Sequence, residues 1–207
     1  MTERKLVKRP GQGSLLELLV IVAVAIGLAL LIQAFLVKPY RIPSGSMLPT
    51  LKVGQRVLVN RLGNRFNDPK IGEIVVFHPP AGAEGAGDTC GTPNPPPGTA
   101  CDKPTPQKAS VNFIKRVVGL PGDKLSIHNG HVIRNGKPES DSYIAPCAGG
   151  SACNLPQTIT VPPDHYFMMG DNRGASDDSR FWGPVPRKWI IGGAFATYWP
   201  PKQVGLL

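Results

Sequence analysis

The chain has 207 residues, of which 18% are charged, and its 23 Lys and Arg against 14 Asp and Glu give a formal net charge of +9. So few charges exclude a disordered polyelectrolyte, and the length excludes a large multidomain enzyme and a miniprotein held by disulfides alone. Basic residues are scattered apart from one N-terminal run, Arg4, Lys5, Lys8 and Arg9, so we expect no nucleic-acid partner. The 24 glycines and 23 prolines favour a loop-rich β protein.

An apolar segment follows this basic N-terminus. Fifteen consecutive residues, 18–32, carry no polar side chain, and the apolar run resumes as far as Val37. Twenty helical residues span about 30 Å, the hydrocarbon thickness of a lipid bilayer. A cleaved secretory signal peptide is the alternative, but its apolar region is only about 7 to 15 residues long and ends at a small-residue site. The sequence predicts a cytoplasmic basic segment over 1–17, one transmembrane helix as an anchor over 18–37 and an extracytoplasmic domain over 38–207.

The part of the chain after the anchor is predicted to be mostly β, with antiparallel strands. Short β-branched runs alternate with turn residues, and Asn129-Gly130 and Asn135-Gly136 are typical of hairpin turns. No segment beyond the anchor has a long 3.6-residue period. We expect an antiparallel β-sheet domain with a smaller inserted β and loop subdomain. The predicted strands cover 56–59, 74–77, 111–118, 124–127, 131–133, 159–161 and 194–199.

Two loop insertions are predicted, over 79–110 and 138–156, each with one pair of cysteines. The first contains eight prolines and five glycines, and we expect an extruded loop closed by a disulfide. Pairing of Cys90 with Cys101 and of Cys147 with Cys153 is the simplest of three connectivities. A zinc site is the alternative, but the spacings lack C-x-x-C and a regular histidine partner. We therefore expect no metal and no cofactor.

The first candidate for chemistry is the segment 42–51, Ile-Pro-Ser-Gly-Ser-Met-Leu-Pro-Thr-Leu, directly after the predicted anchor. Its prolines exclude regular helix around Ser44 and Ser46, and Gly45 permits close approach of a substrate backbone. Such a segment can display a hydroxyl with fixed geometry. An ordinary turn has the same composition, so the segment alone leaves both interpretations open.

A serine nucleophile needs a base, and Lys115 is the best candidate. Alternation over 111–118 places Lys115 on the same face as Val111, Phe113 and Val117. An apolar face removes hydration, which lowers a lysine pKa from about 10.4 and lets the neutral amine accept a proton. The alternative is an amine that reaches water. The histidines occupy turn positions typical of surface residues: His78, His128, His131 and His165.

A third segment, 168–183, mixes small, acidic and basic residues between apolar stretches. It predicts a polar network in which Asp171, Asp178, Arg173 and Arg180 pair. A calcium loop is the alternative, but the oxygen ligands do not alternate as an EF-hand requires and two arginines interrupt them.

Together these segments resemble the motifs of the bacterial type I signal peptidases, the leader peptidases, and of the serine-lysine proteases related to them. The matching stretches, in chain order, are PSGSMLPTL at 43–51, NFIKRVVGLPGD at 112–123, GDNRGASDDSR at 170–180 and AFATYWP at 194–200. Gly174-Ala175 depart from the Asp-Asn that is usual there in the family. The resemblance covers the chain nearly end to end.

The resemblance implies a role for each matching residue. Ser46 would be the nucleophile and Lys115 the general base, while the Ser44 hydroxyl and the Ser46 N–H would form the oxyanion hole. Ser176 would orient the Lys115 amine. The supporting ion pairs would be Asp171 with Arg116 and Asp178 with Arg180. Shallow apolar pockets would accept the small residues that end a signal peptide, with walls from Tyr40, Ile42, Pro43, Met47, Leu51, Phe113 and Ile114.

The sequence therefore predicts a membrane-anchored endopeptidase that cleaves exported preproteins after A-x-A sites, at the outer face of the cytoplasmic membrane. Its partners would be preproteins and the lipid bilayer, and its rate should rise with pH as Lys115 loses its proton. The alternatives are a serine-lysine protease with one dedicated substrate and a non-catalytic, membrane-tethered binding domain. Four aromatic residues are compatible with either a membrane interface or the core: Phe181, Trp182, Trp189 and Trp199. For Trp199 we favour the core.

Overall fold

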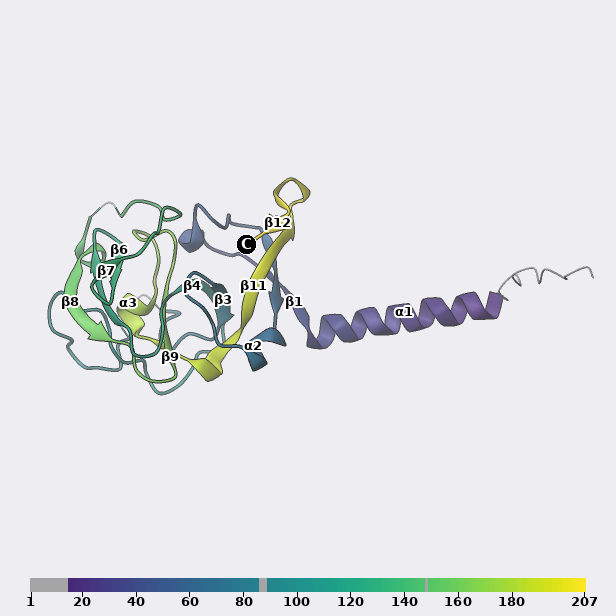
Figure 1. Cartoon of the computed structure of the whole chain (residues 1–207), viewed down its shortest axis with the longest axis horizontal. Helices are drawn as coiled ribbons and strands as arrows, with labels where there is room; N and C mark the ends of the chain where they lie inside the picture. Colours follow the sequence, from purple (N-terminus) through teal and green to yellow (C-terminus); the bar gives the residue numbers. More distant parts are fainter. Residues whose placement is uncertain (1–14, 86–88, 148) are drawn as a thin grey trace, which may run out of the picture.

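The structure is a computed structural model that describes residues 15–85, 89–147 and 149–207. Helix α1 (Leu15–Phe35) projects from a body built mainly of β-strands (Figure 1). Within the described ranges, no helix combines the length and the apolar character needed to cross a membrane. Most of the predicted basic segment, residues 1–14, lies outside the described residues. The predicted anchor also ends later than the helix, because Val37 already belongs to strand β1.

The main sheet is antiparallel and has eight strands among the described residues. Its order is β1 (Val37–Arg41), β2 (Arg56–Asn60), β11 (Ile190–Trp199), β3 (Ile74–Phe77), β4 (Phe113–Gly119), β9 (His165–Met169) and β10 (Val185–Pro186), with β12 (Gly205–Leu206) paired to β11. The short helices are η1 (Gly45–Met47), α2 (Gly63–Phe66), η2 (Ser151–Cys153), α3 (Ser179–Trp182), η3 (Arg187–Trp189) and η4 (Pro201–Gln203). The sheet places β4 directly beside β3 and β9.

A second, four-stranded sheet is inserted between β4 and β9 in the sequence. Its order is β7 (Lys137–Pro138), β6 (His131–Arg134), β5 (Lys124–His128) and β8 (Leu155–Thr160). The Asn129-Gly130 and Asn135-Gly136 turns have positive φ at all four residues, as tight hairpins require. Leu125 and Ile127 of this sheet pack with Val118 and Phe167 of the main sheet. The prediction of a mostly antiparallel β protein with a smaller inserted β unit is confirmed.

The sequence misses two strands that matter for the site. β9 is buried along almost its whole length and contains no β-branched residue, so neither alternation nor a β-branched run reveals it. β1 contains Lys38, Pro39 and Arg41, which interrupt the apolar pattern of a strand, and it begins within the predicted anchor. Strand β4 begins at Phe113, two residues later than the predicted strand.

The first insertion is packed against the body, and its prediction as an extruded loop is wrong. Ala83 and Ala100 are buried in two different core clusters. The N–H of Cys101 donates to the Arg180 carbonyl at 2.9 Å, and the N–H of Gln157 donates to Gly98 at 3.0 Å. Small side chains and paired backbone groups let a proline-rich segment lie close to the sheet. Both predicted disulfides, Cys90–Cys101 and Cys147–Cys153, are present.

The aromatic residues divide between the core and the surface. Trp182 and Trp189 are buried in the main core, and Phe181 packs against it. Trp199 is 49% exposed, so its prediction as a core residue is wrong. It follows an irregularity in the β11 register, and its ring lies 5.9 Å from the Arg56 guanidinium.

Candidate active site

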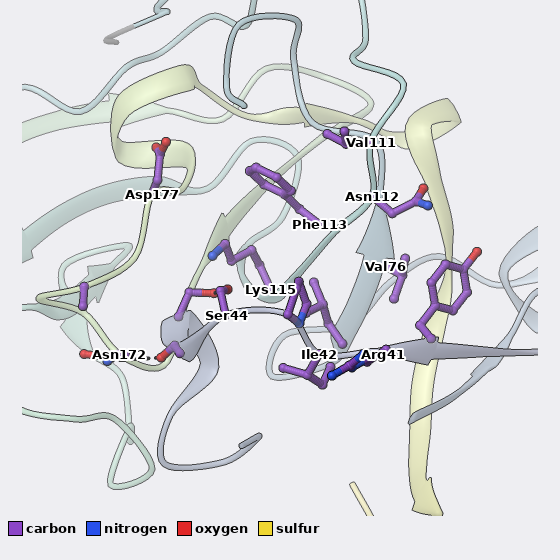
Figure 2. A pocket seen from close by; sticks show the side chains of 16 residues that line it. Arg41, Ile42, Ser44, Val76, Val111, Asn112, Phe113, Lys115, Asn172 and Asp177 are labelled. Carbon is purple, nitrogen blue, oxygen red and sulfur yellow. Dashed lines mark hydrogen bonds between the residues drawn. The ribbon is translucent and has the colours of Figure 1, made fainter. Parts of the chain in front are cut away.

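A cavity of about 750 Å³ joins the three segments that the sequence analysis selected. It is lined by residues 40–46, by residues 111–115 and by three residues of the loop after β9, with Val76 of β3. Figure 2 shows Ser44, Lys115 and Asn172, from three separate segments, around this space. Ser46 and Lys115, 69 positions apart in the sequence, thus line the same cavity.

Ser46 lies in η1, where the chain turns after the extended residue Ser44. Its side chain is only 9% exposed. The Ser44 hydroxyl donates a long hydrogen bond of 3.4 Å to Ser46 Oγ. The backbone is held as well, because Leu48 N–H donates to the Gly45 carbonyl and Asn172 N–H donates to the Ser46 carbonyl. Both hydroxyls therefore stand on a fixed turn at the cavity wall.

Lys115 extends from β4 into the cavity and is 4% exposed (Figure 2). Burial lowers its pKa to about 8, although the carboxylates of Asp178, Asp177 and Asp171 act in the opposite direction. The Phe113 ring lies 5.8 Å from Nζ. The alternative of an amine that reaches water is wrong, because Lys115 is buried. A buried amine with this pKa is largely neutral in mildly alkaline solution and can accept a proton.

Ser176 is buried, and its hydroxyl has no hydrogen-bond partner among the described residues. Gly170 lies between this hydroxyl and the nucleophile segment. A Cβ added at Gly170 would stand 2.2 Å from Ser176 Oγ and 2.4 Å from the Ser46 carbonyl oxygen. Only glycine lets the loop approach both residues at once.

This close approach predicts that Gly170→Ala displaces the turn that carries Ser46. We expect the reactivity of the Ser46 hydroxyl to fall about 100-fold, since displacements of about 1 Å at a reacting group have that scale of effect. Gly205→Ala is the control, because a Cβ there meets nothing within 4 Å. Rates of acylation of Ser46 by a serine-directed reagent, measured with both variants, check the prediction, and equal rates would contradict it.

Two ion pairs with fully buried carboxylates hold the segments together, as the resemblance implies. Arg116 binds Asp171 at 2.6 and 2.8 Å, and Thr50 Oγ1 donates to the same carboxylate at 2.5 Å. Arg180 binds Asp178 at 2.7 and 2.9 Å. Burial alone would raise the pKa of Asp178, but Arg180 holds it below its usual value. The carboxylate also accepts the N–H of Gly170, so these charges fix the loop beside Lys115.

Arg180 connects this loop to both disulfide-closed insertions. Its carbonyl accepts the N–H of Cys101, and its Nη1 donates to the carbonyl of Ala152 at 2.9 Å. Arg173, in contrast, does not pair with Asp171 or Asp178 as predicted. It is buried against the second sheet, donates to the Gly170 and Gly130 carbonyls and lies 3.8 Å from Asp141.

Five of the seven predicted pocket residues line the cavity, namely Tyr40, Ile42, Pro43, Phe113 and Ile114. Met47 and Leu51 do not, and this expectation is corrected. Both are fully buried in a core cluster beneath the cavity, where they pack with Ile42 and Val57. The turn at η1 directs Met47 away from the cavity and into the sheet.

Three contributors to the site escaped the sequence analysis. Thr50 joins the Arg116–Asp171 pair, and the Tyr143 ring stacks 4.1 Å from the Arg116 guanidinium. Asn172 lines the cavity and donates from Nδ2 to the Gly45 carbonyl at 3.1 Å. Asn172 directly follows Asp171 in the third motif, and this position is the sequence signal that could have identified it.

No histidine contributes to the cavity lining in the described part of the chain. His131 pairs with Asp141 at 2.8 Å, and His78 bonds the Val111 carbonyl. Within the same residues, no group of three or more His, Cys, Asp or Glu side chains is placed to hold a metal ion. The cavity presents hydroxyls, the Lys115 amine and an apolar wall, together with the polar residues Arg41, Asn112, Asn172 and Asp177.

The match to a known protein family includes all the residues that line the cavity. The family model described as signal peptidase, peptidase S26, matches residues 15–199. A probable signal peptidase I-2 of Synechocystis sp. is 36% identical over 198 residues, which cover 96% of this chain and 79% of the relative. A probable signal peptidase I-1 of Synechocystis sp. is 39% identical, with 89% and 82% covered. A signal peptidase I of Leptolyngbya laminosa is 37% identical, with 93% and 84% covered.

Proposed function

Because the chain belongs to the signal peptidase family, peptidase S26, we propose that it removes signal peptides from exported preproteins with Ser46 as nucleophile and Lys115 as general base. The observation that carries this proposal is a buried lysine of lowered pKa on the wall of the cavity that also holds Ser46. A neutral amine is the only form of lysine that can take a proton from a serine hydroxyl.

The proposed reaction proceeds in two steps. Lys115 accepts the hydroxyl proton as Ser46 Oγ attacks the scissile carbonyl, and the protonated amine then gives that proton to the departing amino group. The acyl-enzyme is hydrolysed by water, with Lys115 again acting as base. The Ser44 hydroxyl and the Ser46 N–H would stabilise the oxyanion in both steps. Ser176 would orient the amine, which would explain a buried hydroxyl without a partner among the described residues.

The ion pairs would help to keep the Lys115 amine neutral, which is the form that acts as a base. Asp178 is neutralised by Arg180, so it raises the pKa of Lys115 less than an unpaired buried carboxylate would. Arg116 would neutralise the charge of Asp171 in the same way. It also links β4 to the segment around Thr50.

The apolar wall supports a preference for small side chains. Tyr40, Ile42, Pro43, Phe113 and Ile114 would lie against the residues that precede the cleaved bond. Rigid apolar walls exclude large side chains by overlap, so an A-x-A site would fit where a site with bulky residues would not.

We also propose that residues 18–37 anchor the protein in the cytoplasmic membrane, with the peptidase domain of residues 38–207 outside and the basic residues 1–17 inside. Support comes from this apolar run, which only Gln33 interrupts, and from the basic residues before it. Large apolar side chains along α1, such as Leu19 and Ile26, are more than half exposed. Ser46 would then act nine residues beyond Val37, close to the emerging cleavage site of a preprotein.

The experiment that tests the function is incubation of the full, detergent-solubilised chain with several unrelated preproteins that carry A-x-A sites. We expect cleavage directly after the second alanine of each, and loss of cleavage when that alanine is replaced by tryptophan. Cleavage of one preprotein only would favour the dedicated protease. Binding of preproteins without cleavage would favour the tethered binding domain.

A further inference from the structure

Asn172 touches the backbone of the nucleophile on both sides. Its Nδ2 donates to the Gly45 carbonyl at 3.1 Å, and its own N–H donates to the Ser46 carbonyl at 3.0 Å. Figure 2 shows Asn172 at the edge of the cavity with the first of these bonds as a dashed line. The residue therefore holds the two peptide groups that flank Ser46.

The hydrogen bond from Asn172 to the Gly45 carbonyl also fixes the direction of the Ser46 N–H. The Gly45 carbonyl and the Ser46 N–H belong to one planar peptide group, which is not among the cis peptide bonds of the described chain. In a trans peptide the N–H points away from the C=O, so a donor on the oxygen also sets the direction of the N–H. Gly45 contributes no side chain that would limit rotation of this peptide group. A second donor, the Leu48 N–H at 3.1 Å, shares the same oxygen.

We propose that Asn172 is a positioning residue for the oxyanion hole: its side-chain amide holds the Gly45–Ser46 peptide so that the Ser46 N–H faces the carbonyl oxygen of the substrate. This inference rests on the proposed function of Ser46. Asn172 acts through the peptide group, so its contribution appears as charge develops on the substrate oxygen and not when the substrate binds.

The test compares Asn172→Asp and Asn172→Ala with the wild-type chain on one A-x-A preprotein. Asp has nearly the size of Asn but cannot donate when ionised, and the main-chain bond to Ser46 persists in both variants. The carboxylate introduced by Asn172→Asp could raise the pKa of Lys115, which is about 8 in the wild type. Rates are therefore measured near pH 10, where Lys115 remains largely neutral even if its pKa rises. We expect kcat to fall about 10- to 100-fold in both variants, with KM within about twofold and the melting temperature unchanged.

Asn67→Asp is the matched control, because Asn67 also donates from Nδ2 to a glycine carbonyl, that of Gly63, far from the cavity. Its kcat should stay within about twofold of the wild-type value. A wild-type kcat for Asn172→Asp, with loss only in Asn172→Ala, would mean that side-chain volume matters and would overturn the inference. A raised KM at unchanged kcat would overturn it in favour of direct substrate contact.

Failure of this inference can be told apart from failure of the proposed function. If the wild-type chain cleaves and Ser46→Ala does not, the function holds, and the Asn172 variants then decide the inference alone. If the wild-type chain cleaves no preprotein, or Ser46→Ala cleaves normally, the oxyanion-hole role of Asn172 fails with the function.

Discussion

Replacement of Ser46 by alanine should reduce cleavage of an A-x-A preprotein by about 10⁶-fold, the scale on which a serine protease loses activity with its nucleophile. The variant removes the only hydroxyl that the proposed mechanism uses as nucleophile and leaves the turn intact. Ser46 keeps its place through backbone bonds to Asn172 and through the burial of its neighbour Met47. The melting temperature should therefore remain close to that of the wild type.

Single-turnover cleavage with excess enzyme measures this effect over several orders of magnitude. Ser151→Ala, at an exposed serine of η2, is the control and should cleave at the wild-type rate. A Ser46→Ala variant that retains a tenth or more of the activity would place the nucleophile elsewhere. Ser44, the neighbouring hydroxyl in the same cavity, would be the next residue to replace.

Replacement of Lys115 by methionine should lower cleavage by about 10²- to 10⁴-fold, the usual contribution of a general base. The same variant should be more stable than the wild type at pH 7. Burial lowers the pKa of Lys115 from 10.5 to about 8, so the unfolded chain binds this proton more strongly than the folded chain. Wild-type stability is therefore reduced below pH 8 and recovers as the pH rises from 8 to 10.5. Removing the amine removes a penalty of at most about 3 kcal/mol.

Chemical unfolding followed by the fluorescence of the buried tryptophans, Trp182 and Trp189, tests the stability half of this prediction. The difference between Lys115→Met and wild type should be largest at pH 7 and should shrink towards pH 10.5. Lys124→Met, at an exposed position of β5, should change neither activity nor this pH dependence. A Lys115→Met variant that is inactive and less stable at pH 7 would indicate that the lysine is a structural residue.

The strands that the sequence predicts well are those with local evidence. β2, β5 and β6 alternate buried and exposed residues and end at turn residues such as Asn129-Gly130. β9 could not be found in this way, because it neither alternates nor contains β-branched residues, whereas the equally buried β3 is found through Ile74, Val75 and Val76. Alternation along β4 predicts that Lys115 shares a face with apolar residues, but only the structure decides between burial of the amine and its contact with water.

The parts of the site that escaped prediction depend on contacts between distant segments. Asn172 and Gly45 are 127 positions apart, and Thr50 and Asp171 are 121 apart. Composition also could not show which apolar residues around Ser46 line the cavity and which lie only in the core. Ile42 and Met47 are similarly apolar and belong to the same core cluster, yet only Ile42 also lines the cavity.

The pairing of Ser46 with a neutral Lys115 is tested most directly by the pH dependence of wild-type kcat/KM. The base must be unprotonated in the free enzyme, so kcat/KM should rise about tenfold per pH unit in acid and neutral solution. It should level off above the Lys115 pKa of about 8. A flat profile with chemistry rate-limiting, or a single inflection near pH 6.5 as for a histidine base, would contradict the account.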